Sequence, residues 1–131
     1  MSRFERDIVI LVCAISAGVH AALTPDHFGE GLGAGLGFLV ATVLLASLAV
    51  ALTRSAGPPA LALTVATMTG LIAAYALAIT TGLPLLHPEV EPVEGLALAT
   101  KAIEAAGLVA AAHLLAQHRT EALIRLERKL T

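Results

Sequence analysis

The feature that most constrains this chain is the recurrence of apolar runs that match the thickness of a lipid bilayer. The hydrocarbon core of a membrane is crossed by roughly 20 consecutive apolar residues in helical form. Four segments of the 131-residue chain meet or approach that length, at residues 8–23, 31–53, 58–83 and 93–117. The sequence therefore predicts an all-α fold in which residues 1–131 form one domain, an integral membrane bundle of four transmembrane helices.

Composition supports the same class of protein. The chain is 57% hydrophobic and 14% charged, whereas a soluble domain is about 25% charged. The formal net charge of −2 shows no basic bias, so we expect the lipid bilayer and not nucleic acid as the partner. The single cysteine, Cys13, lies inside an apolar run, which excludes an intramolecular disulfide and indicates a packing role.

Basic residues outside the predicted spans all fall on one side of the predicted bundle. They are Arg3 and Arg6, Arg54, and Arg119, Arg125, Arg128 and Lys129. The opposite side carries only carboxylates, namely Asp26, Glu30, Glu89, Glu91 and Glu94. The positive-inside rule then predicts a multi-pass protein of the cell inner (cytoplasmic) membrane with both termini cytoplasmic. A signal peptide is the alternative for the first apolar run, but an even number of spans fits the charge distribution, so we interpret that run as a span.

The polar stretch "TPDHFGE", residues 24–30, separates the first two apolar runs. Thr24 suits an N-cap, Pro25 the first helical position, and Asp26 the positive end of a helix dipole. These signals predict that the second helix begins here. His27 and Glu30, three residues apart, would then share one face of its first turn.

Two further stretches of the sequence predict how the helices pack and where the last helix ends. In "GLGAGLG", residues 31–37, glycines stand four apart, a spacing that lets helices approach closely within the bundle or across a dimer seam. Residues 118–131 keep helical spacing and predict an amphipathic extension of the last helix. It would enter the cytoplasm, lie on the anionic leaflet, or bind a partner.

Histidines and carboxylates converge on the predicted outer rim. At about 1.5 Å per helical residue, His20 would lie just below the outer end of the first span, with His27 and Glu30 on the next helix. His87 and Glu94 come from the outer loop and the start of the last span. Imidazole and carboxylate are ligands of Zn, Cu, Fe and Mn, so these residues form a candidate metal site, with His20, His27 and Glu30 as first-choice ligands. The polar residues at this rim have three alternative explanations: they cap helices, they lie in a solvent-exposed loop, or they reflect the absence of Lys and Arg on the outer side of the membrane.

Two charged residues lie deeper, inside the last span. Lys101 and Glu104 are three apart, so they are expected to pair along the helix, and a charge at this depth is a functional candidate by default. Glu104 could relay protons or bind a cation. A bis-histidine haem would need two ligands at one depth, whereas His20 and His113 are predicted near opposite faces, which argues against haem.

The order of these residues resembles a group of small four-span membrane proteins from high-GC bacteria. The shared pattern has a histidine in the first span (His20), a Pro-[Asp/Glu]-His-x-x-Glu turn at residues 25–30, and Gly-x-x-Phe ending at Phe38. It continues with "TTGLP" at residues 80–84, "EPV" at residues 91–93 and a glutamate in the last span, and it covers about residues 15–110. Asp26 replaces a glutamate of the turn, and Gly and Leu replace aromatic residues at the start of the second span. The resemblance implies a shared architecture in which His20, His27, Glu30, Glu91 and Glu104 belong to the pattern, and it supplies no reaction.

Three functions follow as hypotheses. The first is a small membrane protein with an outward-facing histidine and glutamate site for a transition-metal ion. The second is an accessory or assembly subunit of a larger membrane redox or transport complex, or a homo-oligomer. The third is a small transporter or membrane enzyme that uses Glu104, although the sequence contains no phosphate-binding loop, CxxC or nucleophile-elbow motif.

Overall fold

Four long helices make up the fold. The computed structural model describes residues 3–84 and 86–130. Within that part of the chain the helices are α1 (Arg3–Glu30), α2 (Leu32–Arg54), α3 (Pro58–Ala78) and α4 (Gly95–Leu130). Each is long and apolar enough to cross a membrane, so the predicted all-α four-helix architecture is confirmed and the chain has the build of a multi-pass membrane protein.

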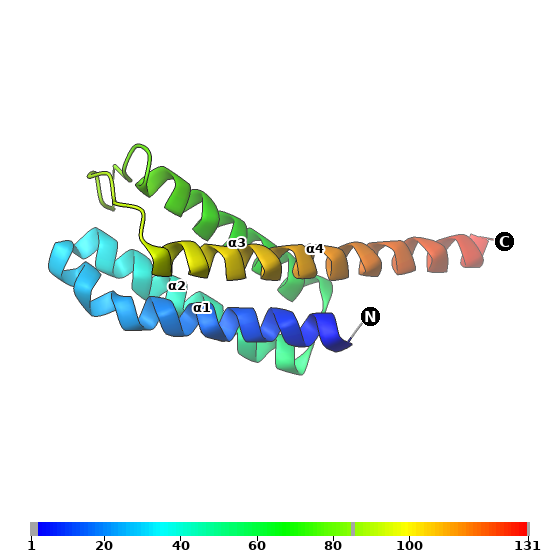
Figure 1. Cartoon of the computed structure of the whole chain (residues 1–131). Coiled ribbons are helices and arrows are strands. Elements are labelled where there is room, and N and C mark those ends of the chain that lie inside the picture. Colours follow the sequence, from blue (N-terminus) through cyan, green and yellow to red (C-terminus); the bar gives the residue numbers. More distant parts are fainter. Residues whose placement is uncertain (1–2, 85, 131) are drawn as a thin grey trace.

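Successive helices run in opposite directions (Figure 1). α1 packs against α2 and α4, and α3 packs against the same two helices, whereas among the described residues the backbones of the diagonal pairs do not approach each other. Both termini lie at one end of the bundle, which we call the terminal end. The α1–α2 junction and residues 79–94 lie at the other end, which we call the loop end. α3 diverges from α2 toward the loop end (Figure 1).

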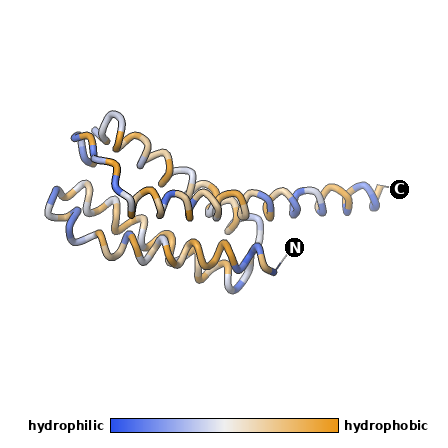
Figure 2. The backbone as a smooth tube through the Cα atoms, in the orientation of Figure 1, coloured by the Kyte–Doolittle hydropathy of each residue, from blue (hydrophilic) through white to orange (hydrophobic). Residues whose placement is uncertain are grey.

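Apolar side chains fill the bundle and also cover much of its outside. The core joins all four helices through Val9, Val12, Leu48, Leu52, Leu61, Met68, Ala111 and Leu114. Outward-facing residues such as Val43, Val50, Leu63 and Val109 are more than half exposed. Apolar segments continue along all four helices (Figure 2), and an apolar exterior is stable in lipid, where no polar coat is needed.

Close helix contacts depend on two glycines. At Gly107 of α4, an added Cβ would lie 2.6 Å from Val12 Cγ1 and 3.0 Å from Met68 Cε, so only glycine lets α4 approach both α1 and α3 here. At Gly35 of α2, an added Cβ would overlap the Phe28 ring of α1. Gly35 therefore packs within the bundle, while a dimer seam stays a prediction.

The predicted boundary between the first two helices is wrong. α1 continues through Pro25 to Glu30, and α2 begins at Leu32 after extended backbone at Gly31 (φ 166°, ψ 156°). Thr24 does not cap a new helix, because its hydroxyl donates to the His20 carbonyl one turn earlier, at 2.7 Å. Pro25 lies inside α1, within two turns of its end, and the helix continues through it to Glu30.

The last two helices differ from prediction at their ends. α3 ends at Ala78 and not at residue 83, because a turn with Gly82 at φ 74° follows it. α4 begins at Gly95 and runs without a break to Leu130. The expected C-terminal extension is thus helical through Leu130, and hydrophilic and hydrophobic segments alternate along it (Figure 2).

Candidate metal centre

Two histidines and two glutamates meet at the loop end. His27, Glu30 and Glu91 each offer a ligand atom, and these three atoms lie within 4.8 Å of one another. Glu30 Oε2 is 3.9 Å from His27 Nε2 and 3.8 Å from His87 Nε2. His87 Nδ1 is 3.8 Å from Glu91 Oε1. We call these four residues the loop-end cluster.

The last turn of α1 supplies one half of the cluster. His27 and Glu30 are three residues apart on one helical face. His27 Nδ1 lies 2.9 Å from the Leu23 carbonyl, and the Phe38 ring of α2 stacks on the imidazole at 3.5 Å between centroids. A ring nitrogen that bonds a carbonyl is the protonated one, which leaves the lone pair on Nε2, on the side of Glu30.

Residues 79–94 supply the other half. Leu83 and His87 form an isolated bridge, in which Leu83 N donates to His87 O at 2.6 Å and His87 N to Leu83 O at 2.8 Å. Glu91 N donates to the Ala78 carbonyl at 3.0 Å, which ties the loop back to α3. His87 Nδ1 lies 3.1 Å from the Glu89 carbonyl, so this imidazole also carries its lone pair on Nε2.

A glycine sets the shape of that loop. Gly82 has φ 74°, and an added Cβ would overlap the Pro88 carbonyl. Positive φ and this close backbone approach both require glycine. The turn therefore folds the following residues back over α3 and brings His87 and Glu91 toward α1.

The charge around the cluster is negative. Residues 20–31 and 79–94 contain five carboxylates and no Lys or Arg. The side chain of Glu30 is 46% exposed, whereas that of His27 is 14% exposed. A cation from solvent is thus attracted to this end and can reach Glu30 directly.

Two candidate metal ligands predicted from the sequence, His20 and Glu94, lie outside the loop-end cluster. His20 is buried, its Nδ1 lies 2.8 Å from the Ser16 carbonyl, and its ring is tilted against Phe38 at 5.3 Å. Phe38 therefore contacts the rings of both His20 and His27. Glu94 is exposed directly before α4, and its carbonyl accepts from Leu98 N at 3.0 Å.

Sequence reasoning assigned Glu91 no ligand role, although it appeared in the family pattern. The available signal was its position four residues after His87, and in the structure His87 Nδ1 lies 3.8 Å from Glu91 Oε1. Phe38 was likewise noted only as part of the pattern. Its stacking on His27 depends on how α1 and α2 pack, which spacing alone does not show.

A polar network lies deeper, between α1 and α4. Lys101 Nζ is 2.7 Å from Glu104 Oε2, so the expected pair is formed, and the Ser16 hydroxyl donates to Glu104 Oε1 at 2.5 Å. Glu104 and Ser16 are fully buried. Both carboxylate oxygens are therefore satisfied, and the charge is neutralised inside the bundle. We call Ser16, Lys101 and Glu104 the buried network.

A cavity of about 260 Å³ connects the two polar regions. Its walls come mainly from small or apolar residues of α2, α3 and the loop: Ala34, Gly37, Phe38, Ala41, Leu71, Ala74, Ala78, Leu83 and Leu86. His27, His87 and Glu91 line it toward the loop end, and His20, Lys101 and Tyr75 line it toward the bundle interior. The Tyr75 hydroxyl is buried and has no hydrogen-bond partner among the residues that the structure describes.

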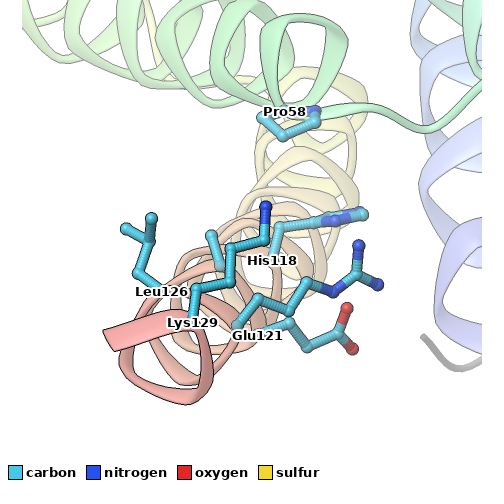
Figure 3. Close-up of a pocket in the computed structure, with 7 residues that line it drawn as sticks. Pro58, His118, Glu121, Leu126 and Lys129 are labelled. Carbon is cyan, nitrogen blue, oxygen red and sulfur yellow. The ribbon is translucent and has the colours of Figure 1, made fainter. Parts of the chain in front are cut away.

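The remaining histidines lie at the terminal end. His113 Nδ1 is 2.8 Å from Glu5 Oε1, and His118 Nε2 is 3.1 Å from the Ala56 carbonyl. A second hollow, of about 570 Å³, lies beside His118 between Pro58 and the side chains of the α4 extension (Figure 3). His113 and His118 thus take part in contacts distant from the loop-end cluster.

Comparisons with protein families, with curated proteins and with solved structures found no match. The resemblance to four-span proteins of high-GC bacteria therefore stays a prediction. Function has to be argued from the residues that the fold brings together.

Proposed function

We propose that this multi-pass membrane protein binds a divalent transition-metal ion at the loop-end cluster. The observation that carries the proposal is the arrangement of His27, Glu30 and Glu91, whose ligand atoms lie within 4.8 Å of one another. His87 adds a second imidazole, with Nε2 3.8 Å from Glu30 Oε2. The basic residues at the terminal end support an orientation with that end in the cytoplasm and the cluster facing outward.

The donor set favours a borderline divalent ion. Two imidazoles and two carboxylates suit Zn²⁺, Fe²⁺, Mn²⁺ or Cu²⁺, whereas Cu⁺ prefers sulfur ligands. The one thiol, Cys13, is buried in the core formed with Val9 and Val12. Zn²⁺ is therefore the first ion to test.

The ligand atoms would have to move together around an ion. Bonds of about 2.0–2.1 Å in tetrahedral geometry place neighbouring ligand atoms about 3.3 Å apart. Glu30 Oε2 lies 3.9 Å from His27 Nε2 and 3.8 Å from His87 Nε2, so each of these pairs would close by about 0.5 Å. The atoms of His27, Glu30 and Glu91 lie within 4.8 Å of one another, so a pair at that limit would close by about 1.5 Å. Both imidazoles are oriented by Nδ1 contacts with backbone carbonyls, and metal-binding histidines commonly donate their other ring N–H to a carbonyl in this way.

A competition titration tests this function. The full-length protein in detergent is stripped with a chelator, and Zn²⁺ is then titrated against a chromophoric chelator. We expect one Zn²⁺ per chain. Glu30→Gln keeps the size of the side chain but removes the charge shared by the two histidines, so we expect affinity at least about ten-fold lower. His27→Ala should lower it similarly.

Glu94→Gln is the matched control, because Glu94 lies at the same end of the bundle and outside the cluster. Its affinity should equal that of the wild type. Less than one Zn²⁺ per chain, with the other three ions also failing to bind, would contradict the proposal. Equal affinities of Glu30→Gln and Glu94→Gln would show that Zn²⁺ binds the acidic surface in general and not this cluster.

A further inference from the structure

We infer that the cavity between α2 and α3 binds the head group of a membrane-dissolved quinone, with Tyr75 and Lys101 as hydrogen-bond donors. This site goes beyond the proposed metal centre. The cavity shares His27, His87 and Glu91 with the loop-end cluster, but the donors proposed here are other side chains that line it. The inference is based on three features of the cavity: unused donors, the absence of an uncompensated positive charge, and a lining of small residues.

Two hydrogen-bond donors line the cavity, the hydroxyl of Tyr75 and the ammonium group of Lys101. The Tyr75 hydroxyl is buried and finds no partner within residues 3–84 and 86–130, and leaving such a group unpaired in an apolar setting is costly. Lys101 lines the same cavity, and its Nζ lies 6.0 Å from the centroid of the Tyr75 ring. The ammonium group has three N–H bonds, and the hydrogen bond to Glu104 uses one of them. A ligand with a carbonyl oxygen would satisfy Tyr75 and a free N–H of Lys101.

The charge of the site points to a neutral ligand. Lys101 is already paired with Glu104 at 2.7 Å, and Ser16 bonds the second carboxylate oxygen. The buried network therefore has no uncompensated positive charge for a phosphate or carboxylate. A quinone presents carbonyl acceptors on a neutral ring, which matches donors without a net charge.

The lining gives the size and the class of the ligand. The small residues that line the cavity come from α2 and α3, namely Ala34, Gly37, Ala41, Ala74 and Ala78. These small side chains leave about 260 Å³, and a cavity of about 150 Å³ already holds one benzene ring. The space therefore accommodates one ring or a fused pair. Because the surrounding helices are of membrane-spanning length, the apolar tail of a quinone would extend into lipid.

The chain provides its own probe for this site. It contains one tyrosine and no tryptophan, so intrinsic tyrosine fluorescence reports on Tyr75 alone. The full-length protein in detergent is titrated with menadione, a two-ring quinone. We expect saturable quenching. Ala74→Leu fills the cavity and should weaken menadione binding at least ten-fold. Ala73→Leu, the control, adds the same side chain at an exposed position on the same helix and should bind as the wild type does.

A second variant covers the case in which Ala74→Leu does not fold. Tyr75→Phe removes only the hydroxyl, and calorimetry should show binding weakened about five-fold, the effect of one lost hydrogen bond. Quenching that does not saturate, or that is equal in Ala74→Leu and Ala73→Leu, would overturn the assignment. Saturable quenching by decanoate and not by menadione would also overturn it, because the site would then take an anionic head group.

Discussion

Replacing Lys101 by methionine is the sharpest test of how this bundle tolerates charge in its interior. Lys101→Met keeps the length of the side chain but leaves Glu104, which is fully buried, with the Ser16 hydroxyl as its one remaining partner in the described part of the chain. Removing one member of a buried ion pair costs about 3–5 kcal/mol. Since about 1.4 kcal/mol is a factor of ten, the unfolding equilibrium constant should rise by about two to three and a half orders of magnitude.

A double variant separates charge from packing. In Lys101→Met combined with Glu104→Gln both charges are gone, while the side-chain sizes are nearly unchanged. Replacing a whole buried pair by uncharged residues is often neutral, so the double variant should recover most of the lost stability. We expect the wild type and the double variant to have similar free energies of unfolding, and Lys101→Met to have a much lower one.

Cys13 makes the measurement direct. It is the single cysteine of the chain and is fully buried, so a thiol-reactive maleimide dye labels it when the bundle opens. The labelling rate at increasing denaturant reports the opening equilibrium of each variant. Lys129→Met, on the exposed extension of α4, is the control for loss of a lysine. If Lys101→Met were labelled no faster than the double variant, charge compensation by Lys101 would not be what stabilises Glu104.

Two glycine substitutions test the loop and the helix packing separately. Gly82→Ala should weaken Zn²⁺ binding, because positive φ and a close backbone carbonyl exclude a Cβ and the loop carrying His87 must move. Circular dichroism should show unchanged helix content, and unaltered Zn²⁺ affinity would show that the loop does not position the site. Gly107→Ala should lower the free energy of unfolding by about 1–3 kcal/mol, because the added Cβ overpacks against Val12. The loss should appear as faster labelling of Cys13. Gly70→Ala, where nothing lies within 4 Å of the added Cβ, should show no such loss, and equal effects would refute the packing argument.

The four helices were predictable because a membrane-spanning helix can be recognised from the length of one apolar run in the sequence. Apolar runs of the required length are set by bilayer thickness and need no knowledge of tertiary contacts. The start of α2 was not predictable in the same way. Thr24, Pro25 and Asp26 have the local preferences of a helix start, yet Thr24 bonds back to His20 and the helix continues to Glu30. Local signals compete here with α1–α2 packing, and packing decides.

That boundary determined how well the loop-end cluster could be predicted. His27 and Glu30 share a face whether they begin α2 or end α1, so their proximity followed from a spacing of three. His20 was expected to meet them from a separate helix. Since all three belong to α1, His20 lies two helical turns before His27, and Phe38 of α2 contacts both rings. Glu91, the cluster residue that was not predicted as a ligand, reaches His27 and Glu30 because the loop that follows the turn at Gly82 approaches α1. Residue spacing alone does not show that approach.

The structure also separates two roles that carboxylates share in the sequence. Membrane sidedness accounts for acidic residues at the loop end as a class, but only Glu30 and Glu91 join the group with His27. Glu104 is different, because Lys101 bonds one of its oxygens and Ser16 the other. A cation moving through the bundle by way of Glu104 would first have to displace Lys101 from that carboxylate. The geometry therefore favours metal binding at the loop end over cation transport through the bundle.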